Sequence, residues 1–290
     1  MKNARMIRTV IQGKPTMEGA GVHLKRVFGN SEVPQFDPFL LLDDFRSSNP
    51  DHYRAGFPWH PHRGIETITY VLNGDVEHGD SMGNKGVISS GDTQWMTAGS
   101  GIIHQEMPRG DNEGRMEGFQ LWANLPRSYK MMAPRYRDIK RSRVPEVTLE
   151  NGVKIKVIFG RVGEHEGPVT GIIIDPEYLD VTVPAKAAFE HPTRRGHTVL
   201  AYVIEGQGYF DDTKKRSIGN GTVCRYTDGD YINVTTAEES VRFLLISGKP
   251  IGEPIAWYGP IVMNTDEELQ LAFEEYRNGT FIKHKKASKI

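Results

Sequence analysis

The amino-acid sequence predicts an all-β protein of two antiparallel β-barrels, with one helix near its C-terminal end. From about Ile7 to Ile261, short runs rich in Val, Ile, Thr, Tyr and Phe alternate with clusters of Gly, Pro, Asn and Asp, as expected for antiparallel strands joined by tight turns. The 31 glycines and 17 prolines suit so many turns. A weak repeat, in which residues 70–74 resemble residues 202–206, predicts that the barrel occurs twice.

The clearest strands border hairpin signals. Residues 67–72 precede Asn-Gly, residues 153–159 follow Asn-Gly, and residues 199–204 precede Glu-Gly. Asn-Gly readily adopts the positive φ angles of a tight hairpin. Residues 222–226 show the alternation of a strand, so Cys224 within them is predicted to be a buried, unreactive side chain. Because Cys224 is the one cysteine, the sequence excludes an internal disulfide and a cysteine-rich metal site.

A helix is expected where Thr265-Asp-Glu-Glu268 forms a capping box, followed by an apolar stripe and then Gly279. The segment from Arg127 to Pro145, which contains two prolines and many basic residues, is predicted to connect the two barrels. We therefore expect an N-terminal, metal-binding barrel in residues 1–134 and a degenerate C-terminal barrel with the helix in residues 135–290.

Charge and hydropathy limit the class of partner. Lysine and arginine total 36 against 37 acidic residues, for a net charge of −1, which argues against direct binding of nucleic acid. The N-terminus lacks the apolar core of an export signal, and no stretch approaches the roughly 20 apolar residues of a membrane span. The expected location is the cytoplasm, extending to the nucleus if the source is eukaryotic, with no membrane partner.

Two pairs of side chains at positions i and i+2 predict a site for one divalent metal ion. His60 and His62 form the first pair, and His104 and Glu106 form the second. In a strand, residues two apart project from the same face, so two neighbouring strands would direct four ligands at one centre. The remaining histidines are assigned surface or hydrogen-bonded core positions, namely His23, His52, His78, His165, His191, His197 and His284.

Glu66 is a rival for the carboxylate ligand. It follows His62 by four residues, and an unbroken strand would turn both to the same face. From the residues alone, either Glu66 or Glu106 is the ligand, and the other orients an imidazole through a hydrogen bond. Three imidazoles and one carboxylate suit Fe, Mn, Ni, Co, Cu or Zn, and they leave coordination positions open.

Several longer blocks resemble the pirin family of the cupin superfamily, whose fold is a bicupin of two jelly-roll-like barrels. The similarity is strongest from Phe36 to about Pro134 and looser beyond. The blocks are Phe36–Asp44, Gly56–Thr67, Gly91–Gly99, Gly101–Pro108 and Gln120–Pro126.

The resemblance implies that His60, His62, His104 and Glu106 bind the metal, that the metal is Fe(II), and that Glu66 lies outside the ligand set. It also implies quercetin 2,3-dioxygenase activity, in which a flavonol reacts with dioxygen and is cleaved to a depside with loss of carbon monoxide. Glu106, or failing it Glu66, would then be the catalytic base that removes the flavonol proton. Two roles are open for Phe57, Trp59, Trp95 and Met96: the core of the barrel, which is the commoner role for such residues, or an apolar mouth for this flat substrate.

The same family suggests an alternative, an iron- and redox-dependent regulator of transcription that binds a protein partner without catalysis. The second half of the chain offers no His-x-His or His-x-Glu pair. We therefore expect one metal ion per chain, held by the first half.

Overall fold

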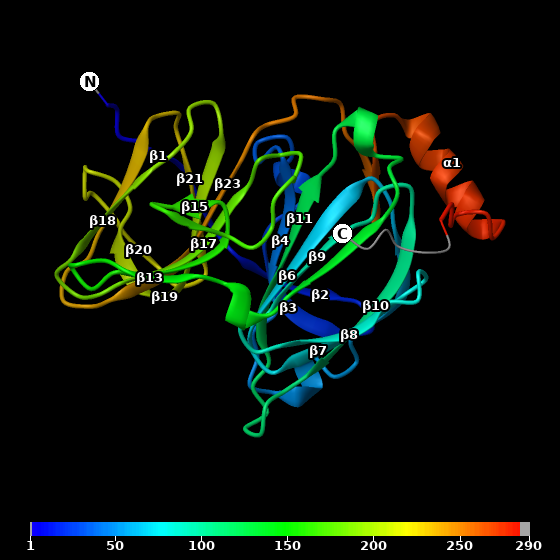
Figure 1. Ribbon diagram of the computed structural model, residues 1–290, viewed down its shortest axis with the longest axis horizontal. Coiled ribbons are helices and arrows are strands. Elements are labelled where there is room, and N and C mark those ends of the chain that lie inside the picture. The colour runs from blue at the N-terminus through cyan, green and yellow to red at the C-terminus, as the bar shows by residue number, and fades with distance from the viewer. Residues whose placement is uncertain (1, 285–290) are drawn as a thin grey trace. The chain divides into compact units, whose positions relative to one another are not determined.

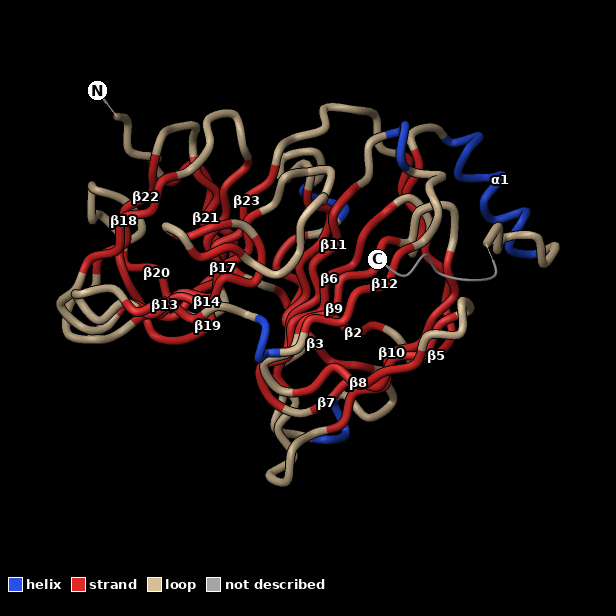
Figure 2. Tube along the Cα trace, viewed as in Figure 1, coloured by secondary structure: helices blue, strands red, loops and turns tan. Residues whose placement is uncertain are grey.

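The computed structural model describes residues 2–284, which form two compact units. The first unit consists of residues 2–13 and 142–250, and the second of residues 14–141 and 251–284. Strands make up most of the regular structure of both units, with a single α-helix among the described residues (Figures 1 and 2). The sequence predicts one division at residue 134, with the N-terminal part of the chain in one domain and the C-terminal part in the other. In the structure the N-terminal residues up to 13 belong to the same unit as residues 142–250, and the residues after 250 belong to the same unit as residues 14–141. No helix in residues 2–284 has the length and apolar composition needed to cross a membrane.

The second unit contains two antiparallel sheets whose inner faces are opposed. The larger sheet has seven strands in the order β12 (Arg135–Ile139), β9 (Thr93–Thr97), β6 (Ile65–Asn73), β11 (Glu117–Asn124), β4 (Phe39–Asp44), β3 (Val22–Phe28) and β2 (Lys14–Glu18). The smaller sheet has four strands in the order β5 (Phe57–His62), β10 (Ile102–Arg109), β7 (Asp75–Asp80) and β8 (Lys85–Ser89). Each sheet ends in two edge strands and does not close on itself. The unit is therefore a jelly-roll-like sandwich of two open sheets in place of a closed barrel.

The end of the chain completes the second unit. A short hairpin of β24 (Ala256–Tyr258) and β25 (Ile261–Met263) precedes the helix α1 (Asp266–Arg277). Thr265 caps the helix, since its side chain accepts from the backbone N–H of Glu268 and the Glu268 side chain accepts in return, as the sequence predicts. Apolar side chains of α1, β25 and the following residues pack into one cluster with a residue of β10, so this segment is anchored beside the strand that carries His104.

The first unit is built on a ten-stranded antiparallel sheet. Its main path runs β1 (Ile7–Gln12), β21 (Thr222–Tyr226), β19 (Thr198–Tyr209), β23 (Val241–Gly248), β17 (Glu177–Val183), β14 (Lys154–Phe159) and β13 (Glu146–Thr148). Off this path lie β18 (Ala188–Pro192), β20 (Ser217–Gly219) and β22 (Tyr231–Thr235). A separate small hairpin joins β15 (Arg161–Val162) to β16 (His165–Glu166).

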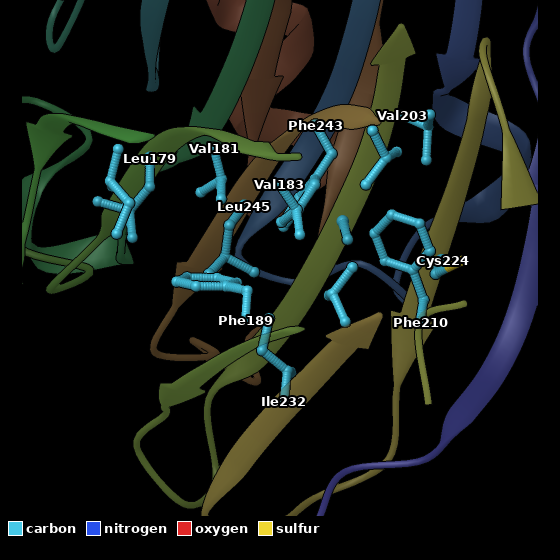
Figure 3. Close-up of a cluster of buried hydrophobic side chains, with 14 of the residues drawn as sticks. Leu179, Val181, Val183, Phe189, Val203, Phe210, Cys224, Ile232, Phe243 and Leu245 are labelled. Atoms are coloured by element: carbon cyan, nitrogen blue, oxygen red, sulfur yellow. The ribbon is translucent and has the colours of Figure 1, made fainter. Parts of the chain in front are cut away.

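The interior of the first unit is filled with apolar side chains. Phe189, Phe210 and Phe243 lie among valine, leucine and isoleucine residues from six of its strands (Figure 3). Cys224 is buried in the same cluster, and burial raises the pKa of its thiol to about 12. The prediction that Cys224 is an unreactive core residue is therefore confirmed.

Candidate metal centre

The strands that carry the predicted ligands are neighbours in the smaller sheet of the second unit. β5 and β10 pair antiparallel, with His60 directly opposite His104 and His62 opposite Ile102. Directly opposed residues share a face, so His60, His62 and His104 project together. The register shifts between His104 and Glu106. This bulge changes how Glu106 is aimed relative to the three imidazoles.

The three imidazoles form a compact cluster. One ring nitrogen from each of His60, His62 and His104 lies within 4.8 Å of the others. The ring centroid of His104 is 4.4 Å from that of His60 and 4.9 Å from that of His62. His104 is fully buried, and neither of its ring nitrogens has a hydrogen-bond partner. Burying an unpartnered polar atom is costly, and a bound cation would satisfy it.

Hydrogen bonds fix the tautomers of the other two imidazoles. His60 Nδ1 lies 2.8 Å from the carbonyl oxygen of Pro58, and His62 Nδ1 lies 2.9 Å from that of Pro260. A carbonyl oxygen can only accept, so each Nδ1 carries the proton and each neutral ring presents an unprotonated Nε2. These two Nε2 atoms are 3.0 Å apart. Two facing lone pairs repel unless a cation lies between or beside them.

Burial favours the neutral, metal-binding form of His62 and His104. Burial, helped by the charge of His60, lowers the pKa of His62 to about 3. Burial also lowers the pKa of His104 well below its usual value, with repulsion from His60, His62 and His78 acting in the same direction. Protonation of His62 and of His104 is therefore disfavoured at neutral pH. The donor set fits a divalent transition-metal ion.

Glu106 lines the same cavity as His60 and His62, but its carboxylate is not among the donor groups that cluster with the three imidazoles. It is buried, and its Oε1 is 3.0 Å from the Thr69 hydroxyl oxygen of the facing sheet. The same hydroxyl oxygen is 2.6 Å from Gln120 Oε1. Because a hydroxyl has a single proton, Thr69 donates to Glu106 or to Gln120 at any moment. The Thr69 hydroxyl group can therefore direct its proton to Glu106 when that carboxylate is charged, or to Gln120 when it is not.

Glu66 occupies a different environment. β5 ends at His62 and β6 begins at Ile65, with Gly64 between them at a φ of +79°. The strand is therefore interrupted, and the parity argument that placed Glu66 on the same face as His62 does not apply. Glu66 Oε1 accepts from the Thr97 hydroxyl at 2.6 Å, and burial raises the pKa of its carboxyl group. Glu66 and Thr69 are three positions apart on β6, so Glu66 points to the face opposite that of Thr69, which lines the cavity.

A cavity of about 530 Å³ adjoins the imidazoles. His60, His62 and Glu106 line it on the side of the smaller sheet, and Thr69 and Gln120 on the side of the larger one. Its volume suits a small organic molecule. Its apolar and aromatic wall consists of Leu24, Leu41, Phe45, Phe57, Val76, Trp122 and Trp257.

The four side chains considered for the core or for an apolar mouth divide between these roles. Phe57 lines the cavity, but Trp59 is 52% exposed, and Trp95 and Met96 are buried elsewhere in the unit. Two other tryptophans take their place. Trp122 contacts His62 edge-on, with 5.0 Å between the ring centroids, and Trp257 lies beside Trp122 at 6.0 Å. Trp257 comes from the end of the chain, so local sequence could not connect it with the histidine motif.

From the sequence, His78 is assigned to a surface or hydrogen-bonded core position, and Asp80 has no predicted role. On β7, Asp80 is directly opposite His104, and His78 is directly opposite Glu106. The His78 ring centroid lies 5.3 Å from that of His104, and His78 Nε2 is 3.5 Å from Asp80 Oδ2. The signal was present, since His78 and Asp80 are a third pair at i and i+2. Both side chains are buried and flank the cluster on the side away from β5.

The first unit has no equivalent cluster among its described residues. Its buried His191 is paired instead with Glu177, at 2.9 Å between Nε2 and Oε1. The corresponding interior is occupied by the apolar core around Phe189. The imidazole cluster accordingly lies in the second unit alone.

Comparison with known proteins places the chain in a family. The family model described as Pirin matches residues 21–123, and the model described as Pirin C-terminal cupin domain matches residues 178–282. Together they span most of the strands of both units.

Individual relatives match over nearly the whole chain. A Pseudomonas aeruginosa protein, provisionally named a quercetin 2,3-dioxygenase, is 42% identical over 283 aligned residues, covering 96% of this chain and 99% of the relative. A pirin-like protein of Caulobacter vibrioides is 42% identical over 278 residues, with coverage of 96% and 99%. A crystal structure of quercetin 2,3-dioxygenase from Acinetobacter baumannii superimposes with a TM-score of 0.87 at 32% identity, over 96% of this chain and 99% of that one. The chain therefore belongs to the pirin family, whose two-domain cupin fold it shares.

Proposed function

We propose that this protein is a metal-dependent dioxygenase that acts on flavonol-like aromatic substrates. In this proposal one Fe(II) ion per chain is bound by His60, His62, His104 and Glu106, and Glu106 also acts as the catalytic base. The enzyme class is suggested by the A. baumannii quercetin 2,3-dioxygenase, which is similar over nearly the whole chain.

One observation carries the metal assignment. The unprotonated Nε2 atoms of His60 and His62 face each other at 3.0 Å, because both Nδ1 protons are committed to backbone carbonyl oxygens. The nearby ring of His104 is buried without a hydrogen-bond partner. This arrangement is stable when a cation accepts the lone pairs, and burial disfavours protonation of His62 as the alternative.

The bound ion would supply Lewis-acid and redox chemistry toward the flavonol oxygen and dioxygen. Glu106 would accept the proton of the flavonol hydroxyl group. While Glu106 is ionised, the Thr69 hydroxyl donates to it. Once Glu106 holds the substrate proton, Thr69 can turn its own proton to Gln120 Oε1, 2.6 Å away, and accept from Glu106. The new charge state is thus accommodated without moving a side chain.

The cavity supports a flat, largely apolar substrate. Trp122 and Leu41 are opposite each other on neighbouring strands, and both line the wall of the cavity. Their side chains can cover an aromatic ring and exclude water from it. The alternative of a redox-dependent regulator with a protein partner stays a prediction, and a cavity of about 530 Å³ beside the imidazoles favours a small molecule.

A quercetin assay tests this proposal. Protein stripped of metal and reloaded with Fe(II), or separately with Mn(II), Co(II), Ni(II), Cu(II) or Zn(II), is mixed with quercetin without oxygen and then exposed to it. We expect the absorbance of quercetin to fall only after oxygen is admitted, and one molecule of carbon monoxide to be released for each molecule of quercetin consumed. The control is His104→Ala under the same loading. Rates no greater than those of free metal ions, for every metal, would overturn the enzymatic proposal.

A further inference from the structure

A row of polar side chains crosses the inner face of the larger sheet in the second unit. Thr69, Gln120, Asp43 and Arg26 stand opposite one another in register on the neighbouring strands β6, β11, β4 and β3. All four line the cavity. The row begins at Thr69, which contacts Glu106, and continues away from the imidazoles. Asp43 and Thr69 are the buried members of this row, and burying polar side chains beside a cavity is costly, which suggests a ligand-binding role.

The far end of the row is a tightly held ion pair. Arg26 Nε donates to Asp43 Oδ1 at 2.9 Å, and Arg26 Nη2 donates to Asp43 Oδ2 at 2.8 Å. Arg26 Nη1 donates to Glu18 at 2.8 Å, so the guanidinium group is fixed from both sides. The Asp43 side chain is only 8% exposed. Both of its carboxylate oxygens are therefore held in place beside the cavity.

The Asp43 carboxylate retains capacity to accept further hydrogen bonds. Each carboxylate oxygen has two lone pairs, and Arg26 uses one on each. The side-on fork of Arg26 occupies the two parallel (syn) lone pairs, so the two free lone pairs point away from each other, and one of them can accept from one phenolic hydroxyl group. Thr69 and Asp43 are two strand spacings apart, which is roughly 10 Å. That separation suits a molecule with two connected ring systems rather than one ring.

We propose that Asp43, positioned by Arg26, binds the ortho-dihydroxyphenyl ring of a polyhydroxylated flavonol while its other ring system lies at the imidazole cluster. The proposal rests on the proposed dioxygenase function and names its preferred substrate class. Leu41 and Trp122, one step along the same strands, would pack against the body of the molecule. One hydroxyl group of this ring donates to the Asp43 carboxylate, and such a charge-assisted bond strengthens binding by roughly ten- to a hundredfold.

The test compares quercetin with galangin, a flavonol that lacks the two vicinal hydroxyl groups. Dissociation constants are measured without oxygen, by quenching of tryptophan fluorescence, on metal-loaded protein. We expect the wild type to bind quercetin at least tenfold more tightly than galangin. In Asp43→Asn that preference should fall to within about twofold, chiefly through weaker quercetin binding. If the wild type bound quercetin and galangin with equal affinity, that result alone would overturn the proposal.

The neighbouring residue provides a matched control. Asp44 also forms a bidentate pair, with Arg46 at 2.8 and 2.7 Å, but it is the next residue of β4 and so points to the opposite face. Asp44→Asn should keep the quercetin preference of the wild type. If both variants lose it equally, the effect is structural and the assignment of Asp43 is wrong. Melting temperature and metal content are measured on both variants.

The outcome is separable from that of the proposed function. Selective binding of quercetin that depends on Asp43, without consumption of oxygen, would support the binding site and overturn the reaction. If the protein consumed both quercetin and galangin in an oxygen-dependent reaction but bound the two with equal dissociation constants, the reaction would be supported and the binding site overturned.

Discussion

The Nδ1 atom of His62 lies 2.9 Å from the carbonyl oxygen of Pro260, a residue 198 positions further along the chain. Pro260 connects β24 to β25, and the hairpin is part of the same compact unit as the histidine motif. The hydrogen bond fixes both the tautomer and the orientation of the His62 ring, as partners of metal-binding histidines commonly do. The end of the chain thus helps to shape a site whose histidines lie in the first half of the sequence.

His62→Ala should abolish tight metal binding. The substitution removes one of the two facing Nε2 atoms and leaves His60 and His104 as the remaining imidazoles. We expect the dissociation constant for Co(II), measured by its visible absorption, to rise by more than about 100-fold, which exceeds the usual effect of an outer partner. His23→Ala serves as the control, because His23 is exposed and stacks on His52. Equal effects of the two substitutions would contradict the assignment.

Glu106→Gln and Glu66→Gln should separate the two candidate carboxylates. Gln keeps the shape of Glu but is a poor ligand and no base, so Glu106→Gln should weaken metal binding at least tenfold and lower kcat by about 10²- to 10⁴-fold. Glu66 bonds to Thr97, and its carboxyl pKa is raised by burial, so the neutral Gln should be tolerated. Metal content and turnover of Glu66→Gln are expected to match the wild type. If Glu66→Gln lost its metal and Glu106→Gln kept it, Glu66 would be the ligand and Glu106 would not.

Lys130 should make stability depend on pH. Its buried Nζ donates to the carbonyl oxygens of Gly64 and Val262 and to the side chain of Asn124, and burial lowers its pKa from 10.5 to about 7. Between those pH values the unfolded chain binds more protons than the folded one, so stability rises with pH.

The comparison for this prediction is Lys130→Met, which removes the titrating group together with its hydrogen bonds. The difference in melting temperature between wild type and Lys130→Met should widen from pH 7 to pH 9.5, reflecting up to about 1 kcal/mol per pH unit in the wild type. Substitution of the exposed Lys85 with Met should give a difference that does not change with pH in this way. A constant difference for Lys130→Met would contradict the lowered pKa.

Gly64→Ala should disrupt the site through the backbone. Gly64 has a φ of +79°, and a Cβ atom there would overlap the carbonyl oxygen of Val262. We expect a loss of about 3 kcal/mol or more in the free energy of unfolding, together with weaker metal binding. Gly83 has a similar φ of +85° but open space around it. Gly83→Ala should therefore cost only about 1 kcal/mol, as measured by urea denaturation, and should retain metal.

Features set by neighbouring residues could be predicted from the sequence alone. The strands of residues 67–72 and 153–159, the capped helix that begins after Thr265 and the burial of Cys224 follow from side-chain periodicity and turn chemistry. The pairing of His60 with His62 follows from the two-residue repeat of a strand, whose geometry is local. These inferences require only that successive backbone units adopt regular conformations.

Tertiary structure decided which distant segments complete the site. Gly64 interrupts the strand and separates the environment of Glu66 from that of His62, a change that no periodicity argument could anticipate. Trp257 and the Pro260 carbonyl reach the cavity because the chain returns to the second unit after residue 250. Asp43 and Arg26 join Thr69 through the register of four strands. Periodicity specifies the face of each strand, whereas the choice of partners depends on the burial of apolar surface over the whole unit.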